Sequence, residues 1–199
     1  MNKYDKVETV YKQIFDGLNG YTISLLEKEK REKQEPIFKD ILYGEVPLGL
    51  LYALFVLPPT DKYIQKSKVF YDLGSGIGNA VIGAYLAGFE KSVGIEIMET
   101  LYQTSLIAKK RMNESKGVTF IKDDILNVDF SEADVILFCC PTKDEHLRNE
   151  MEAKFENLKK DTLILSLIHQ IKSPHFELLD HKLVKVAWGE THLFSYIKN

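Results

Sequence analysis

Apolar residues recur at helical spacing near the amino terminus of the chain. They occupy positions 7, 10, 11, 14 and 15, and glycines follow at positions 17 and 20. This pattern predicts an amphipathic helix that ends before the glycines. A second helix is expected from about Thr22 into the charged run 27–33, where acidic and basic residues alternate. Alternating charge favours a solvated helix face over a nucleic-acid-binding or nuclear-import signal.

A third helix is predicted after Pro47, from Leu48 to about Phe55. Proline is favoured at the start of a helix, and the pair Pro58-Pro59 ends this one. The apolar stretch from Leu48 to Leu57 is too short to cross a bilayer.

From Val69 onward, short apolar runs alternate with helical segments. The runs are VFYDLG, SVGIEI, VTFIKDD, DVILFCC and TLILSLI. Helices are expected over Asn79–Ala87, from about Glu99 to Met112, and from about Asp144 through an apolar stripe that ends at Leu158. Strands that alternate with helices are typical of a parallel sheet covered on both faces.

The chain closes differently, because the runs 182–188 and 192–198 are separated only by residues 189–191. Such a short connection predicts an antiparallel hairpin. A seven-stranded, mostly parallel sheet that ends in such a hairpin is the layout of the Rossmann-like class I methyltransferase fold. We therefore expect an α/β protein in one structural unit. Residues 1–60 would form N-terminal helices and a cofactor lid, and residues 61–199 the cofactor-binding domain.

Composition narrows the function classes. A chain of 199 residues, 45% of them hydrophobic, has room for one well-buried domain. Its formal net charge of -3 lacks the basic excess typical of proteins that neutralise nucleic-acid phosphates. The adjacent Cys139 and Cys140 cannot join distant parts of the fold, and the amino terminus lacks the apolar core of a signal peptide. We expect a reduced, intracellular protein without a membrane segment.

A glycine-rich turn at residues 72–79 joins the first strand to its helix. Gly74 and Gly76 allow the backbone to approach a ligand closely. The dinucleotide fingerprint requires a further glycine three residues after Gly76, but that position is Asn79. S-adenosylmethionine (SAM) has a cationic amino-acid end and no pyrophosphate. Asp72, just before the glycines, therefore predicts a SAM site that includes Ser75.

Acidic residues also end the next two strands. Glu96, followed by Ile97, is placed to accept both ribose hydroxyls, as acids do at this position in nucleotide-binding sheets. Asp124 is placed to accept the adenine amino group, with Ile125 packed on the ring. The alternative is that Asp72, Glu96 and Asp124 only cap helices and turns. The histidines form no metal pattern, and no metal is expected.

The segments DLGSGIGN and GIEIM, with Tyr43-Gly44-Glu45 upstream, resemble the disruptor-of-telomeric-silencing family of histone-lysine methyltransferases. The resemblance implies that Tyr43, Glu45, Asp72, Gly74, Gly76, Asn79, Glu96 and Asp124 contact SAM. It also implies that Trp188 lies beside the channel for the acceptor lysine, while a tryptophan in the core of the hairpin is the alternative. Tyr43, Glu45 and Trp188 are the candidate catalytic residues, and Phe138 and Phe194 are candidate channel walls.

The chain also departs from this family. Cys139-Cys140-Pro141 replaces the pair of asparagines that follows the fourth strand, so Cys139 would stand at the cofactor in their place. The long basic segment that grips nucleosomes is absent. We therefore expect SAM-dependent methylation of a protein lysine, with neither nucleosomes nor nucleic acid as favoured partners. A small-molecule or RNA methyltransferase and a noncatalytic subunit of a larger assembly remain alternatives. The oligomeric state stays open.

Overall fold

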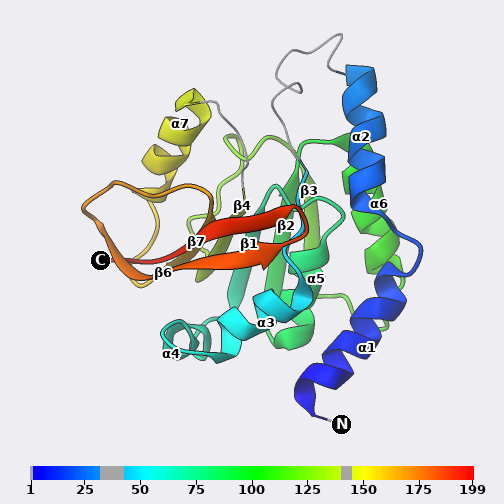
Figure 1. The fold of residues 1–199 in the computed structure, drawn as a ribbon, viewed down its shortest axis with the longest axis horizontal. Helices are drawn as coiled ribbons and strands as arrows, with labels where there is room; N and C mark the ends of the chain where they lie inside the picture. Colours follow the sequence, from blue (N-terminus) through cyan, green and yellow to red (C-terminus); the bar gives the residue numbers. More distant parts are fainter. Residues whose placement is uncertain (1, 32–42, 140–144) are drawn as a thin grey trace.

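The computed structural model describes residues 2–31, 43–139 and 145–199. Seven strands in these ranges form one sheet with the order β3-β2-β1-β4-β5-β7-β6 (Figure 1). The strands are β1 (Val69–Leu73), β2 (Lys91–Glu96), β3 (Val118–Lys122), β4 (Val135–Cys139), β5 (Leu163–Leu167), β6 (Phe176–Val186) and β7 (Gly189–Lys198). The first five pair in parallel, whereas β7 is antiparallel to both β5 and β6. The predicted Rossmann-like class I methyltransferase fold is confirmed.

The helices follow the predicted order. They are α1 (Lys3–Phe15), α2 (Gly20–Arg31), α3 (Leu48–Val56), α4 (Asp61–Ile64), α5 (Asn79–Ala87), α6 (Glu99–Lys110) and α7 (Glu145–Phe155). The short α4 was not predicted, and α2 begins earlier than Thr22 because the Asn19 side chain accepts the Thr22 N–H at 3.0 Å. Such a side-chain acceptor satisfies a backbone donor of the first turn. The predicted start of α7 at Asp144 lies outside the described residues.

The C-terminal hairpin has a tighter turn than predicted. Val186 pairs with Gly189, so Ala187 and Trp188 alone form the turn. The prediction that residues 189–191 form the loop was wrong, because these residues belong to β7. Gly189 has a φ of 126°, a conformation that glycine adopts without steric cost. Trp188 is therefore a turn residue, and the alternative of a tryptophan in the hairpin core was also wrong.

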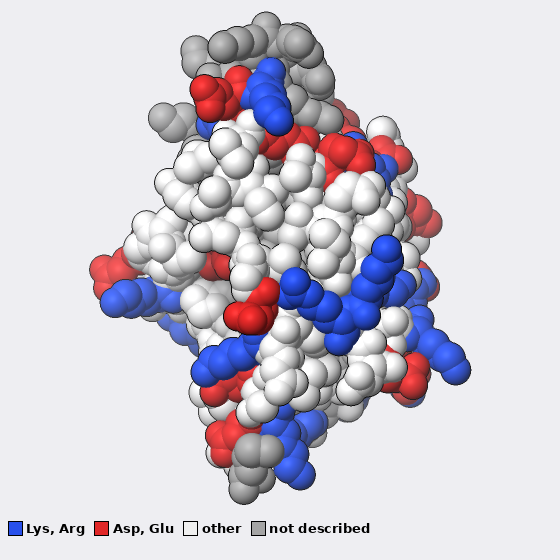
Figure 2. Space-filling view, turned by 90° about the vertical axis from the view of Figure 1, so that its right-hand side faces the viewer, with Lys and Arg blue, Asp and Glu red and all other residues white. Residues whose placement is uncertain are grey.

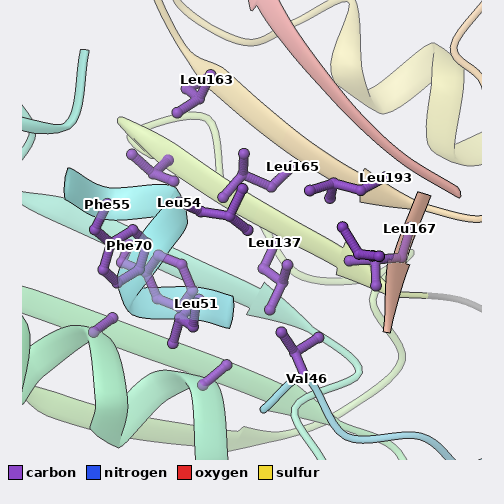
Figure 3. Packing of buried hydrophobic residues seen from close by; sticks show 14 of the residues in the cluster. Val46, Leu51, Leu54, Phe55, Phe70, Leu137, Leu163, Leu165, Leu167 and Leu193 are labelled. Carbon is purple, nitrogen blue, oxygen red and sulfur yellow. The ribbon is translucent and has the colours of Figure 1, made fainter. Parts of the chain in front are cut away.

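One face of the sheet packs against α3 and α5. Leu51, Leu54 and Phe55 of α3 lie over Phe70 of β1 and Leu137 of β4 (Figure 3). Burying each such side chain contributes roughly 1.5–3 kcal/mol. This packing fixes the start of α5, and hence the glycine turn, against the carboxyl ends of the strands.

The opposite face packs against α7. Met151 and Phe155 of that helix are buried in a second core cluster. The Phe155 ring meets the Phe138 ring of β4 edge to face, with 5.4 Å between centroids. This geometry is favoured between aromatic rings. Between β3 and β4, Ile125, Leu126 and Phe130 complete this layer without a helix.

α1 and α2 lie beside α5 and α6. Figure 2 shows the side of the molecule that these helices form. Basic and acidic side chains are interspersed there and separated by uncharged surface. No helix within the described residues is both long and apolar enough to cross a membrane.

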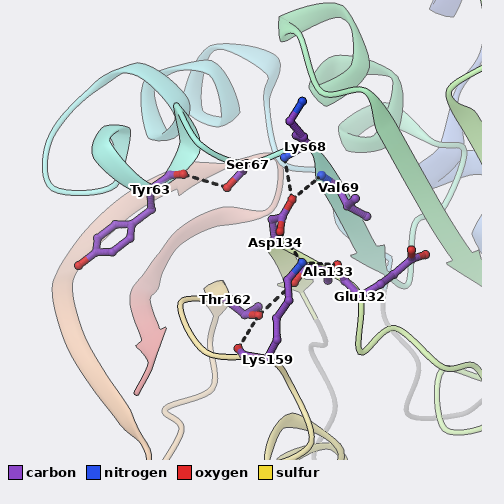
Figure 4. A network of polar contacts seen from close by, with 9 residues as sticks. All are labelled: Tyr63, Ser67, Lys68, Val69, Glu132, Ala133, Asp134, Lys159 and Thr162. Carbon is purple, nitrogen blue, oxygen red and sulfur yellow. Dashed lines mark hydrogen bonds and ion pairs between the residues drawn. The ribbon is translucent and has the colours of Figure 1, made fainter.

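A polar network joins the strands at their amino ends, opposite the glycine turn (Figure 4). Asp134 Oδ2 accepts the N–H groups of Lys68 and Val69 at 2.7 and 2.9 Å, and Asp134 Oδ1 pairs with Lys159 Nζ at 2.5 Å. The Thr162 hydroxyl donates to the Ala133 carbonyl at 3.0 Å. The network therefore ties β1 to the start of β4 and to the loop before β5.

β6 forms one edge of the sheet. Its pairing with β7 shifts register between Leu178 and Asp180, which marks a β-bulge or irregularity. Asp180 pairs with Lys182 at 2.9 Å, and Lys185 is exposed farther along the strand. The edge is thus irregular and charged.

Candidate cofactor site

The carboxyl ends of β1 and β2 bring the glycine turn beside Glu96. This side chain is buried, and each of its oxygens accepts a backbone N–H group. Oε2 accepts from Gly76 at 2.7 Å, and Oε1 accepts from Met98 at 2.7 Å. An ionised carboxylate has about four lone-pair sites. Glu96 can therefore hold the turn in place and still have acceptor capacity for a ligand.

Two glycines allow the turn to approach its neighbours. A Cβ atom on Gly76, whose φ is 55°, would lie 2.7 Å from Tyr43 Cε2. A Cβ atom on Gly94 in β2 would lie 2.5 Å from Ser75 Oγ. Gly94 was not among the predicted site residues, although its place two residues before Glu96 could have indicated it. The first contact brings the turn against Tyr43, and the second brings it against β2.

Asp72 is a buried acid next to this turn. Burial raises its pKa well above the usual value, and repulsion from Glu96 adds to the effect. Burial also raises the pKa of Glu96, although the hydrogen bonds from Met98 and Gly76 oppose the rise. Asp72 has no comparable compensation among the described residues. A cationic group placed here would favour the ionised form of Asp72.

Two further polar atoms at the turn have no hydrogen-bond partner within the described part of the chain. They are Ser75 Oγ and Asn79 Oδ1, both buried. Buried polar atoms are normally hydrogen-bonded, so such exceptions call for a ligand or a bound water. With Asp72, they fit a ligand that carries an ammonium group, such as the amino-acid end of SAM.

The Tyr43–Glu45 segment covers the glycine turn. The Tyr43 hydroxyl donates to Glu45 Oε1. Burial raises the pKa of Tyr43, and Glu45 raises it further, while a backbone hydrogen bond from Ile77 opposes the rise. The predicted lid residues therefore lie next to the predicted cofactor turn.

The hairpin turn contacts the same lid. A Cβ atom on Gly44 would lie 2.2 Å from Trp188 Cζ3, so the indole packs directly on the lid backbone. The Ala187 N–H donates to the Glu45 carbonyl at 3.4 Å. Trp188 nevertheless keeps 38% of its surface exposed. The three candidate catalytic residues are thus gathered near the carboxyl ends of the strands.

Phe138 and Phe194 do not share this place with Trp188. Both are buried in the cluster that packs against α7. Phe194 stacks on His181, with 4.4 Å between ring centroids. Their assignment as channel walls therefore stays a prediction.

The remaining predicted residues surround the turn less closely. Asp124 is half-buried and Oδ1 accepts the Leu126 N–H at 2.9 Å, so this acid does shape a turn. Ile125 packs on the core cluster below α7, and Ile97 packs with Met98 and Tyr43. Cys139 is half-buried at the end of β4. Cys140 and Pro141 lie outside the described residues.

The described residues contain no group of three or more His, Cys, Asp or Glu side chains arranged to hold a metal ion.

Comparison with known families identifies this arrangement. Residues 72–176, which begin at Asp72 of the glycine turn, match the model of the ANTKMT methyltransferase domain. The chain belongs to this methyltransferase family. It also has the class I fold, and SAM is the cofactor of this methyltransferase. The resemblance to histone-lysine methyltransferases is likewise supported.

Curated relatives include lysine methyltransferases. The chain is 32% identical over 196 residues to an H3 lysine-79-specific histone-lysine N-methyltransferase from Debaryomyces hansenii, covering 91% of this chain and 16% of the relative. It is 27% identical to a protein-lysine N-methyltransferase from Saccharolobus islandicus, covering 55% of this chain and 67% of the relative. The methyltransferase spans only 16% to 29% of the length of the first three fungal relatives.

Solved structures give a related picture. An RNA methyltransferase from Salinibacter ruber, in complex with S-adenosyl-L-homocysteine, superposes with a TM-score of 0.54 at 25% identity. The match covers 78% of this chain and 94% of that one. The methyltransferase therefore resembles proteins with two named classes of acceptor.

Sequence reasoning missed one more acid, Glu27. The charged run 27–33 was interpreted as a solvated face, and Glu29 is indeed exposed. Glu27 is buried, however, with 6% of its surface exposed, so the interpretation was wrong at this position. Nothing in the alternating pattern distinguishes Glu27 from Glu29, because its burial depends on the distant helix α6.

Proposed function

We propose that this methyltransferase transfers the methyl group of SAM directly to the side-chain amine of a protein lysine. The observation that carries the proposal is the contact between lid and hairpin. Tyr43 packs on the glycine turn, and the neighbouring Gly44 packs on the partly exposed Trp188. This arrangement puts an aromatic surface next to the cofactor residues. The Debaryomyces and Saccharolobus relatives, both named as lysine methyltransferases, support the same acceptor class.

On this proposal, residues of the glycine turn hold the amino-acid end of SAM, and the acids at the end of β2 and after β3 hold its adenosine end. Asp72 binds the ammonium group, and Ser75 and Asn79 use the polar atoms that lack partners in the described chain. Glu96 accepts the ribose hydroxyls. Asp124 accepts the adenine amino group through the carboxylate oxygen that Leu126 does not use. Gly74, Gly76, Ile97, Ile125 and Cys139 complete the surroundings of the cofactor.

Bound SAM supplies a methyl group that its sulfonium has already activated for displacement. The chain must orient the acceptor amine and exclude water. The lysine must also lose its proton, and an apolar environment helps because it disfavours the ammonium form. Trp188 supplies apolar surface of this kind. Tyr43 and Glu45 orient the lid through their mutual hydrogen bond.

RNA is the second candidate acceptor, because the Salinibacter protein is named as an RNA methyltransferase. The net charge of -3 argues against it, since phosphate binding calls for basic surface. The mixed charges of Figure 2 argue in the same direction for that face. Protein lysine therefore remains the better-supported acceptor class.

The test is transfer of label from methyl-tritiated SAM to a cell extract by the wild type, Glu96→Ala and Trp188→Ala. The wild type should label material that is sensitive to protease and resistant to ribonuclease. Acetylation of the lysines of the extract should prevent the labelling. Glu96→Ala should lose SAM binding, measured by calorimetry. Trp188→Ala should keep SAM binding within about twofold and lose most of the transfer, because Trp188 is assigned to the acceptor side.

Label that ribonuclease removes would assign RNA as the acceptor and overturn the lysine proposal. Retention of full SAM affinity by Glu96→Ala would overturn the cofactor assignment instead. Glu90→Ala is the matched control. Glu90 lies at the amino ends of the strands, and its side chain pairs only with the exposed Lys68 among the described residues.

A further inference from the structure

The first turn of α6 depends on a side chain from another helix. Its N-cap residue is Met98, whose side chain makes no capping hydrogen bond. Glu27 of α2 supplies the missing acceptors. Oε1 accepts the Glu99 N–H at 2.8 Å, and Oε2 accepts the Thr100 N–H at 2.7 Å. Free N–H groups at a helix start need such partners, and the helix dipole favours a carboxylate there.

The same turn holds Glu96 in place. Met98 donates its N–H to Glu96 at 2.7 Å, and the next two N–H groups bind Glu27. Three successive backbone donors are therefore divided between two buried carboxylates. A movement of this turn would change the position of Glu96 and of the neighbouring Ile97.

α2 also contacts the lid. A Cβ atom on Gly20, the first residue of α2, would lie 1.9 Å from Tyr43 Oη and 2.8 Å from Glu45 Oε1. Ile23 packs in one apolar cluster with Tyr43 and Ile97. The helix rises about 10 Å between Gly20 and Glu27. α2 thus joins the lid at its start to the first turn of α6.

A second buried carboxylate so close to Glu96 is electrostatically unfavourable. Burial raises the pKa of Glu96, backbone hydrogen bonds oppose the rise, and repulsion from Glu27 adds to it. A serine or aspartate at position 98 would cap α6 locally, without a buried acid from another helix. The long-range contact therefore does more than complete a helix, since it fixes α2 relative to Glu96.

We propose that Glu27 is a positioning residue for the cofactor. It holds the turn that carries Glu96 and Ile97 against α2, and so sets the place of the adenosine part of SAM beneath the lid. This inference rests on the assignment of Glu96 to the ribose.

The test is calorimetric titration of Glu27→Ala and Glu27→Gln with SAM and with 5′-methylthioadenosine, which lacks the amino-acid end. The titrations with both ligands are carried out well below the melting temperature of each variant. Glu27→Ala should weaken the binding of both ligands about tenfold, an effect of the size expected for the loss of a helix cap. Glu27→Gln should weaken them about threefold, because its amide oxygen can still accept one N–H group. Glu29→Ala and Glu29→Gln, on the same helix, should leave both affinities unchanged.

A lower melting temperature with wild-type affinities would make Glu27 a structural cap only and overturn the inference. Loss of SAM binding with unchanged 5′-methylthioadenosine binding would overturn it too, because the adenosine turn would then be intact. Glu96→Ala distinguishes failure of the Glu27 inference from failure of the proposed cofactor site. If that variant loses binding while Glu27→Ala does not, only the inference fails.

Discussion

Buried acids determine the chemistry of this site at the scale of single residues. Asp72, Glu96 and Glu27 are each at most 6% exposed. Burying an ionised carboxylate without a cation is unfavourable. The backbone N–H groups that bind Glu96 and Glu27 offset part of this cost, whereas Asp72 has no such donor among the described residues. Ligand binding and stability should therefore oppose each other at Asp72.

We expect Asp72→Asn to stabilise the ligand-free protein and to weaken SAM binding. The raised pKa means that ionised Asp72 destabilises the fold, and that this cost appears as pH rises from the usual carboxyl range through the folded pKa. The variant removes this cost, on the order of 1 kcal/mol or about 3 °C in Tm at neutral pH. It also loses a charge-assisted contact, so the Kd for SAM should rise at least about tenfold.

Calorimetry and thermal melts between pH 5 and pH 8 measure both effects. Wild-type SAM affinity should increase with pH as Asp72 ionises, and the variant should show a flatter profile. The stability difference should shrink toward acid pH. A variant with lower Tm and wild-type affinity would contradict the assignment of Asp72 to the ammonium group.

At the scale of elements, the amino ends of the strands depend on Asp134. Burial tends to raise the pKa of this acid, but hydrogen bonds from Lys159, Lys68 and Val69 outweigh it and hold the pKa below the usual value. A lowered pKa gives stability that is present above the usual carboxyl range and is lost as pH falls through the folded pKa. Asp134 should therefore stabilise the junction of β1 and β4 at neutral pH.

Replacing Asp134 with alanine should lower the free energy of unfolding by about 2 kcal/mol at pH 7, because two backbone donors and Lys159 lose their acceptor. Asp134→Asn should cost about 1 kcal/mol, since one oxygen remains. Urea unfolding at pH 7 and pH 3 measures the difference in the free energy of unfolding between the wild type and each variant. This difference should shrink at the lower pH. Glu90→Gln, which breaks an exposed ion pair with Lys68, should change little. Equal losses at Asp134 and Glu90 would contradict this role for Asp134.

The order of elements could be predicted because periodicity and turn residues are local properties. The strands from Val69 onward and α5 followed from short apolar runs and from glycines. The hairpin turn could not be placed, because its position depends on the register between β6 and β7, which the local pattern does not determine. Glu27 was missed for the same reason, since its burial is decided by α6. Local patterns identify elements, while contacts between elements complete the site.

At the scale of the whole molecule, the class of the cofactor was predictable and the acceptor was less so. The glycine turn and the acids at the ends of β1 and β2 lie within a short stretch of sequence. The proposed acceptor side combines the adjacent Tyr43 and Gly44 with Trp188, which lies far along the chain and meets them only in the fold. The chain spans only 16% to 29% of the length of its first three fungal relatives, so their substrate is not carried over to it.

The exposed edge of β6 has a consequence for solubility. An unpaired strand edge can bind the edge of another molecule and so begin an aggregate. Lysine side chains and bulges discourage this association. The double variant Lys182→Gln/Lys185→Gln should therefore scatter light earlier than the wild type when concentrated protein is warmed. Lys109→Gln/Lys110→Gln on α6 has the same net charge and should not.

Equal aggregation of the two double variants would assign the effect to net charge alone. If the β6 variant aggregates faster, the charged edge limits the growth of the sheet beyond its seven strands. Resistance to fibrous association would then depend on a few lysines far from the cofactor, which no measurement of methyl transfer would detect.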